Sequence, residues 1–122
     1  MQLMRYISAL FLVCGSKSGV MICAGAAVNT GSVIGDGVII NTNSSVDHHN
    51  RIGAFAHVAP GAQLGGEVSI GEGAVISIGS SVISGRSVGG WAVLGAGSVA
   101  IKDIPSNSVF AGVPARLLRR KK

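Results

Sequence analysis

Aromatic and charged residues are scarce in this sequence, and cysteine is almost absent. Aromatic residues make up 4% of the chain and charged residues 12%, whereas 48% of the residues are apolar. The apolar content excludes a disordered, highly charged chain. The two cysteines, Cys14 and Cys23, allow at most one bridge, which excludes a disulfide-rich scaffold. With 122 residues in total, we therefore expect one domain with a core of small, stacked aliphatic side chains.

Long apolar runs and a recognisable secretion signal are also missing. No apolar run reaches the length of about 18 residues that a membrane span needs, so we predict no membrane partner. Residues 6–14 are apolar but form too short a run for a signal peptide and lack a small-residue cleavage site. We interpret residues 1–20 as an N-terminal cap, in part a short amphipathic helix. A cytoplasmic location with free thiols follows as the default.

Positive charge is concentrated at the C-terminus. Ten Lys and Arg oppose five Asp and Glu, which gives a formal net charge of +5. Five of the ten basic residues lie within residues 116–122, so residues 1–115 have five basic and five acidic groups and sum to zero. A basic tail without a basic face does not favour nucleic-acid binding. Two interpretations of the tail remain open, a solvated end and a phosphate-binding segment.

A six-residue repeat dominates the rest of the sequence. Every sixth position from Ile22 holds Ile, Val or Leu, until Ala100 breaks the series: Ile22, Val28, Ile34, Ile40, Val46, Ile52, Val58, Leu64, Ile70, Ile76, Val82, Val88 and Leu94. The position three residues later is mostly Gly, which accepts positive φ and indicates a turn. The position four residues later is small, except at Asn50 and Arg86.

Such a unit, with one turn and two inward positions, is a short strand followed by a corner. Three units close one triangular coil, and successive coils stack at the strand spacing of about 4.8 Å. Residues 21–100 are therefore predicted to form an all-β, single-stranded parallel β-helix of about four coils. Residues 101–122 are interpreted as an exit segment followed by the basic tail.

The pattern resembles the left-handed β-helix of the hexapeptide-repeat acyltransferases, and the handedness comes from this resemblance. Residues 102–105 (KDIP) and 112–116 (GVPAR) are similar to the family's exit from the helix. Residues 46–53 (VDHHNRIG) and 55–62 (FAHVAPGA) are similar to bacterial sugar acetyltransferases of the sialic acid and bacillosamine type. The resemblance implies transfer of acetyl from acetyl-CoA to an amine or hydroxyl of a sugar, by a homotrimer that holds CoA between subunits.

Acyl transfer needs a base that takes the proton of the attacking group, and histidine has a suitable pKa, near 6.5. His48, His49 and His57 all fall at outward phases of the repeat. The resemblance implies that His48 is the catalytic base, and a solvated surface histidine is the alternative. The subgroup usually has an acidic residue directly after the base, where this chain has His49, whereas Asp47 precedes the base. We hypothesise that a His49–Glu67 pair replaces the missing acid, because Glu67 occupies the position of His49 on the next coil.

The resemblance also implies residues that bind acetyl-CoA. It assigns contacts to His57, Ile78 and Ala96 and puts Gly66 close to the thioester. A step of one coil stacks Gly66 above His48, and the same step stacks Ile78 and Ala96 in the column of another corner. A neighbouring subunit would close the gap between the two corners. In the basic tail, Arg116 is the residue best placed to meet CoA phosphates.

Two outward columns indicate a partner surface. Ile39, His57, Val75 and Val93 stack on one face, whereas the matching positions of the other two faces are mostly polar or small. This apolar stripe suggests the trimer interface, with scattered surface valines as the alternative. Two aromatic residues, Phe55 and Trp91, occupy turn positions where Gly is usual. We interpret both as residues that pack at a subunit interface or at an end of the helix, in preference to residues that stack on a ligand.

The acceptor side of the site is the weakest part of the resemblance. The sugar acetyltransferases begin with a separate α/β domain, whereas only the short segment 1–20 precedes the repeats here. We therefore expect a small acceptor such as an amino sugar, a partner that supplies the domain, or a remnant. The alternative function is a non-catalytic trimeric scaffold or a CoA-binding remnant. The histidine spacing does not resemble the zinc site of the γ-type carbonic anhydrases, so no metal is expected.

Overall fold

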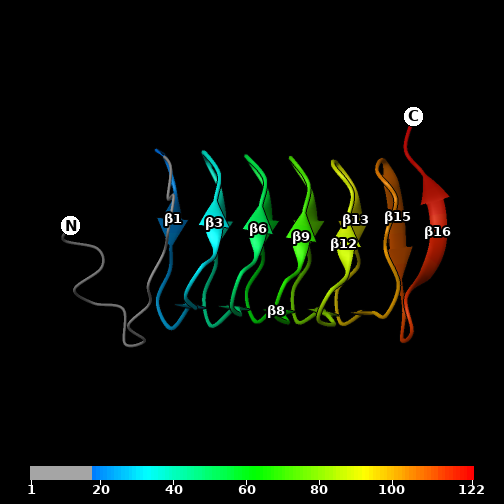
Figure 1. The fold of residues 1–122 in the computed structure, drawn as a ribbon. Helices are drawn as coiled ribbons and strands as arrows, with labels where there is room; N and C mark the ends of the chain where they lie inside the picture. Colours follow the sequence, from blue (N-terminus) through cyan, green and yellow to red (C-terminus); the bar gives the residue numbers. More distant parts are fainter. Residues whose placement is uncertain (1–17) are drawn as a thin grey trace.

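The protein is a stack of triangular coils in the computed structural model, which describes residues 18–122 (Figure 1). Within this range, every regular element is a β-strand, and most of the strands have two residues. They form a left-handed parallel β-helix of about five coils, which confirms the predicted fold class. The predicted N-terminal cap lies almost entirely outside the described residues. No helix in the described part of the chain is long and apolar enough to cross a membrane.

Each side of the triangle is one sheet, to which the regular coils contribute every third strand in parallel. The first face contains β1 (Met21–Ile22), β4 (Ile39–Ile40), β7 (His57–Val58), β10 (Val75–Ile76) and β13 (Val93–Leu94), followed by β15 (Ser108–Ala111) and β16 (Arg116–Arg120). The second face contains β2 (Ala27–Val28), β5 (Ser45–Val46), β8 (Gln63–Leu64), β11 (Ser81–Val82) and β14 (Val99–Ala100). The third face contains β3 (Val33–Ile34), β6 (Arg51–Ile52), β9 (Ser69–Ile70) and β12 (Ser87–Val88).

Four-residue turns connect the faces and stack into three corners. The first corner (41–44, 59–62, 77–80, 95–98) joins the first face to the second. The second corner (29–32, 47–50, 65–68, 83–86) leads to the third face, and the third corner (35–38, 53–56, 71–74, 89–92) returns to the first. One residue of each turn has a left-handed backbone, and six non-glycine residues adopt it: Asn43, His49, Phe55, Glu67, Trp91 and Asn107.

The core is a column of aliphatic side chains along the helix axis. In each two-residue strand the second side chain points inward and is buried, as at Ile40, Val58 and Ile76, which are 0% exposed. Each strand pairs with the equivalent strand of the next coil, so the side chain of Val58 lies between those of Ile40 and Ile76. Burying one such side chain contributes about 1.5–3 kcal/mol. This stacking explains why the core needs so few aromatic residues.

The helix continues beyond residue 100, where the sequence analysis ended it. β14 includes Ala100, which is buried, and β15 adds a further parallel strand beside β13. Ile104 fills the inward position in between and pairs with Val88 of the previous coil. β16 then turns back antiparallel to β15 and ends the stack. The basic tail is therefore a paired strand with exposed side chains, and the predicted exit segment contributes to the last coil.

The short last coil explains Arg86 at a normally small inward position. The step from Val88 to Ile104 is two residues shorter than a regular coil, so the chain cuts across the second corner and leaves Arg86 without a full turn above it. The Arg86 side chain reaches the surface there, and its Nε lies 4.0 Å from Asp103 Oδ1.

Replacing one residue of the aliphatic column will test the core. We expect Ile76→Ala to lower the free energy of unfolding by about 2–5 kcal/mol, because it leaves a cavity between two packed coils. Gln63→Ala, which truncates an exposed outward side chain, should change the free energy by less than about 0.5 kcal/mol. Denaturant titrations of both variants measure the difference, and equal losses would contradict the stacked core.

Candidate functional site

The second corner presents both neighbouring histidines to solvent. Backbone hydrogen bonds between coils hold it in place: the His49 amide donates to the Thr30 carbonyl (3.0 Å), and the Glu67 amide donates to the His48 carbonyl (2.9 Å). His48 and His49 are both exposed. His48 therefore has a fixed backbone and an accessible side chain, as a catalytic base requires.

A buried amide fixes this corner from the inside. Asn50 is 0% exposed, and its Nδ2 donates to the carbonyls of Asp47 (2.9 Å) and Gly65 (2.9 Å). It also lies 3.3 Å from the His48 carbonyl. The sequence analysis noted Asn50 only as an exception to the small-residue rule and missed its structural role. Its position two residues after His48 was the signal that could have pointed to it.

The His48 imidazole lies between a glycine and a second imidazole. Gly66 stacks on the coil after His48, and a methyl group at Gly66 would overlap the Nε2 of His48. On the other side of the ring, His48 Nδ1 lies 3.1 Å from His49 Nδ1. One ring must donate and the other accept, because two protonated or two bare nitrogens would repel. When His48 donates, its Nε2 is unprotonated and lies against the buried Gly66.

Asp47 binds the side chain of Asn29 and the backbone of His48. Its Oδ1 accepts hydrogen bonds from Asn29 Nδ2 (2.9 Å) and from the His48 backbone amide (2.8 Å). The Asn29 bond and then the His48 amide hold the pKa of the Asp47 carboxyl below its ordinary value. Asp47 therefore remains charged and fixes the backbone of His48.

Glu67 stacks on His49 but does not bind it. Within residues 18–122, the single ion pair joins Arg86 to Asp103, and the side-chain partner of His49 is His48. Glu67 and His49 instead share a hollow of about 370 Å³ at the edge of the third face. Its lining residues are Gly31, Val33, His49, Arg51, Glu67 and Ser69.

His57 lies on the first face, one side of the triangle away from His48. The Thr42 amide donates to Asn41 Oδ1 (2.8 Å), which leaves Asn41 Nδ2 to donate to His57 Nε2 (3.0 Å). A neutral His57 therefore carries its proton on Nδ1 and can donate it to a ligand. Asn41 is a second residue that the sequence analysis missed.

The first corner brings Ile78 and Ala96 together in one exposed column. The Gly97 amide donates to the Ile78 carbonyl (2.9 Å), which stacks the two turns directly. Ile78 is 62% exposed, which is unusual for a large aliphatic side chain. This column lies at a different corner from His48, so one copy of the chain does not bring the two together.

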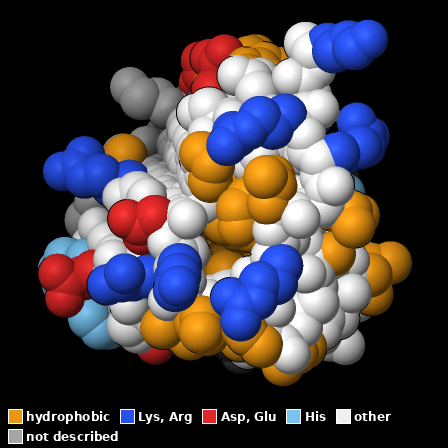
Figure 2. All heavy atoms as spheres, turned by 90° about the vertical axis from the view of Figure 1, so that its right-hand side faces the viewer, with side chains coloured by type: hydrophobic (Ala, Val, Ile, Leu, Met, Phe, Trp, Pro, Cys, Tyr) orange, Lys and Arg blue, Asp and Glu red, His pale blue; other side chains and the backbone are white. Residues whose placement is uncertain are grey.

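Arg116 lies at the C-terminal end of the helix. It begins β16 and lines a hollow of about 290 Å³ with Lys102, Phe110 and Leu117. Figure 2 looks onto this end and shows Lys and Arg side chains spread around a hydrophobic centre.

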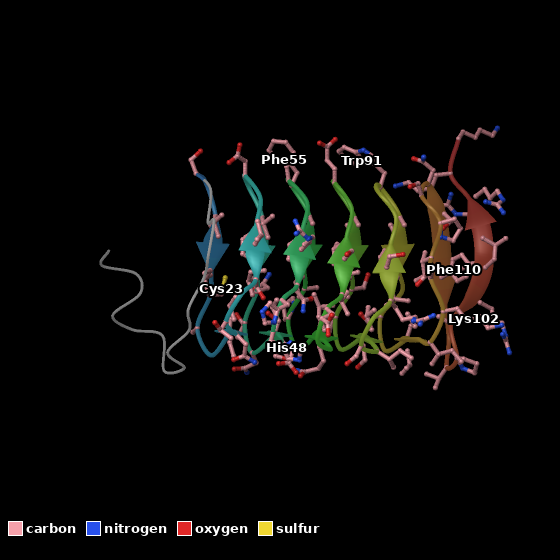
Figure 3. The ribbon with its side chains drawn as sticks, in the orientation of Figure 1. Cys23, His48, Phe55, Trp91, Lys102 and Phe110 are labelled. Carbon is pink, nitrogen blue, oxygen red and sulfur yellow. The ribbon has the colours of Figure 1, made fainter. Side chains whose placement is uncertain are left out.

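Exposed apolar side chains lie on the first face and at two turns of the third corner, which also carries the exposed Asp36 and Glu72. Met21, Phe55 and Trp91 are 52%, 62% and 48% exposed, and the outward residues of the first face are only half-buried. Figure 3 shows Phe55 and Trp91 along one edge of the prism and His48 along another. Among residues 18–122, no three His, Cys, Asp or Glu side chains gather into a metal site.

Solved structures of similar sequence and fold include several acetyltransferases. PerB from Caulobacter crescentus, solved with CoA and GDP-perosamine, is 39% identical with a TM-score of 0.78, over 88% of this chain and 53% of that chain. The acetyltransferase domain of PglB from Neisseria gonorrhoeae, solved with acetyl coenzyme A, is 38% identical with a TM-score of 0.78, over 88% and 57%. A hexapeptide transferase family protein from Anaplasma phagocytophilum is 26% identical with a TM-score of 0.81, over 94% and 76%.

The chain is similar in sequence and in fold to hexapeptide-repeat acetyltransferases. No protein-family model matches it. It spans little more than half the length of PerB and of the PglB domain. As a hexapeptide-repeat protein it presents its site residues on two corners and one face of the prism.

Removing the Asn29 side chain will test the environment of Asp47. We expect Asn29→Ala to raise the Asp47 pKa toward its ordinary value. The variant removes the Asn29 hydrogen bond, which is the largest cause of the lowered pKa. The lowered pKa stabilises the folded state above the ordinary carboxyl pKa, and this contribution disappears as the pH falls through the lowered value. An NMR titration of the Asp47 carboxyl measures the shift, and Thr30→Ala serves as the control. An unchanged pKa in Asn29→Ala would show that the bond does not form.

Proposed function

We propose that the protein transfers an acetyl group from acetyl-CoA to a hydroxyl or amine of a sugar-like acceptor. The observation that carries the proposal is the exposed His48, whose ring lies against Gly66 at its Nε2 edge and against His49 at its Nδ1. The similarity to PerB and to the PglB domain, which were solved with CoA and with acetyl-CoA, supports the same chemistry. The proposed compartment is the cytoplasm.

His48 is the proposed general base. In its reactive form it donates Nδ1–H to His49 Nδ1 and takes the proton of the acceptor on Nε2 as the acceptor attacks the thioester carbonyl. The tetrahedral intermediate then expels the CoA thiolate, which recovers the proton from His48. His49 orients the ring and accepts the bond that a carboxylate accepts in related sites, while Asp47 holds the backbone of His48.

Acetyl-CoA is proposed to bind between two copies of the chain in a homotrimer. His57, Ile78 and Ala96 of one copy would hold CoA against Gly66 and His48 of the next, since these groups lie on different corners of one prism. The apolar first face and the third corner, with Phe55 and Trp91, are the proposed subunit interface. Arg116 would pair with a CoA phosphate.

The alternative is a trimeric scaffold or CoA-binding protein without turnover. It is supported by His49 in the place of an acid and by the length of the chain relative to PerB. An assay that separates binding from chemistry distinguishes the two functions.

Substituting His48 and His57 separately makes that distinction. We expect His48→Gln to lower the rate of acetyl transfer by about 10²–10⁴-fold with little change in acetyl-CoA affinity, because only the proton acceptor is lost. His57→Gln should instead weaken acetyl-CoA binding. Calorimetric titration and thiol release with glucosamine measure the two effects. Saturable binding without transfer in the unaltered protein would establish the scaffold function.

A methyl group at residue 66 will test the space beside His48. We expect Gly66→Ala to lower the transfer rate at least tenfold, because the new methyl displaces the imidazole. An unchanged transfer rate in Gly66→Ala would exclude a role for the close packing of His48 against Gly66.

A further inference from the structure

Charge is divided unequally along the axis of the prism. Residues 18–100 contain two basic and four acidic residues, whereas the C-terminal end, residues 101–122, contains six basic residues and one acidic residue. The formal charge is therefore −2 for residues 18–100 and +5 for the C-terminal end. The single ion pair within residues 18–122 joins Asp103 of this end to Arg86 and uses none of the six basic residues. An anionic surface would attract the C-terminal end and repel the rest of the prism.

The aliphatic column reaches the surface at the same end. Phe110 pairs with the buried Leu94, and Leu117 pairs with Phe110, so both residues continue the inward column. Leu117 is nevertheless 47% exposed, because β16 is the last strand of its sheet. Val113, in the turn before β16, and Leu118, within β16, are 71% and 68% exposed. The middle of the C-terminal end is therefore apolar.

The basic and the apolar side chains occupy one surface. Figure 2 shows Lys and Arg side chains around the hydrophobic centre of this end. Lys102 and Arg116 line the hollow of about 290 Å³, which Leu117 also lines, and β16 adds the exposed Arg119 and Arg120. Long basic side chains can bury their methylene stems in apolar surroundings while the charge stays in a polar layer. Basic residues combined with exposed aliphatic residues are typical of proteins that lie on anionic bilayers.

We propose that the C-terminal end binds the surface of a membrane that contains anionic phospholipids. The Lys and Arg side chains pair with lipid phosphates, while Val113, Leu117 and Leu118 enter the boundary between headgroups and acyl chains. The negative charge of residues 18–100 keeps the rest of the prism away, so its axis stands upright on the membrane. A nucleic acid would match the positive charge but would leave the apolar centre without a partner. The absence of a membrane span, from which the sequence analysis predicted no membrane partner, does not oppose this association.

The association leaves the second corner accessible. Ile101, where the C-terminal end begins, lies three coils after Asp47 in the same column. Three coils correspond to about 14 Å along the axis. His48 therefore remains in solvent when the end touches a membrane, and lipid binding can be measured independently of acetyl transfer.

Sedimentation with vesicles of phosphatidylcholine, with and without phosphatidylglycerol, tests the role of charge. We expect the vesicles that contain phosphatidylglycerol to bind at least about tenfold more tightly, and the difference to disappear at high salt. Arg119→Gln should weaken this binding about fivefold. Arg51→Gln is the matched control: it also removes an exposed positive charge, but three coils from the end, beyond the Debye length of about 8 Å at physiological salt. Equal binding to both kinds of vesicle, or equal losses in the two variants, would overturn the proposal.

A substitution at Leu118 distinguishes a bilayer from other anionic partners. We expect Leu118→Ser to weaken binding to the anionic vesicles by about threefold or more, because less apolar surface enters the bilayer. Leu118 is exposed, so the substitution should leave the fold intact. Binding to a DNA duplex, which offers phosphates without an apolar layer, should not change in this variant. Tighter binding of the unaltered protein to the duplex than to the anionic vesicles would assign the end to nucleic acids and overturn the membrane proposal.

Discussion

Stacking of identical coils at a fixed register is the constraint on which the structure depends. Each strand pairs with the equivalent strands of the coils before and after it, so the position of an outward side chain within its coil determines its neighbours. The aliphatic column stabilises this order by burying one Ile, Val or Leu per strand. Chemistry on such a prism can change by substitution at outward positions without disturbing the core.

At the corners, several turns depart from the regular repeat, because a residue other than glycine occupies the position with a left-handed backbone. A left-handed backbone costs a non-glycine residue about 1–2 kcal/mol, yet His49, Phe55, Glu67 and Trp91 adopt it. These four side chains are all exposed and divide between the second corner, which carries His48, and the third corner. The stabilisation from the buried aliphatic column outweighs this backbone strain, so that these turn positions can present a side chain at the surface.

The six-residue period was sufficient to predict a parallel β-helix, because it identifies both the inward residues and the turns, whereas the left-handedness came from the family resemblance. It also identified which residues share a column, for example Gly66 with His48 and Glu67 with His49. It could not predict the last coil, because Ile104 follows Val88 two residues too early for the regular spacing. The period could not predict side-chain contacts either. It gives the column in which His49 lies, but the side-chain conformations determine that His49 contacts His48. The three carbonyls near the Asn50 amide are a further case, since a buried polar network appears only in three dimensions.

The antiparallel return of β16 has a consequence for solubility. A parallel β-helix exposes unpaired backbone groups on its last coil, and a second copy could add to that edge and continue the stack without limit. On the first face, β16 occupies this position with a strand that runs in the opposite direction. Its exposed Arg116, Arg119 and Arg120 would also confront the same three charges of an approaching copy. The hairpin thus acts as a terminator that protects a repetitive fold from growing into a fibre.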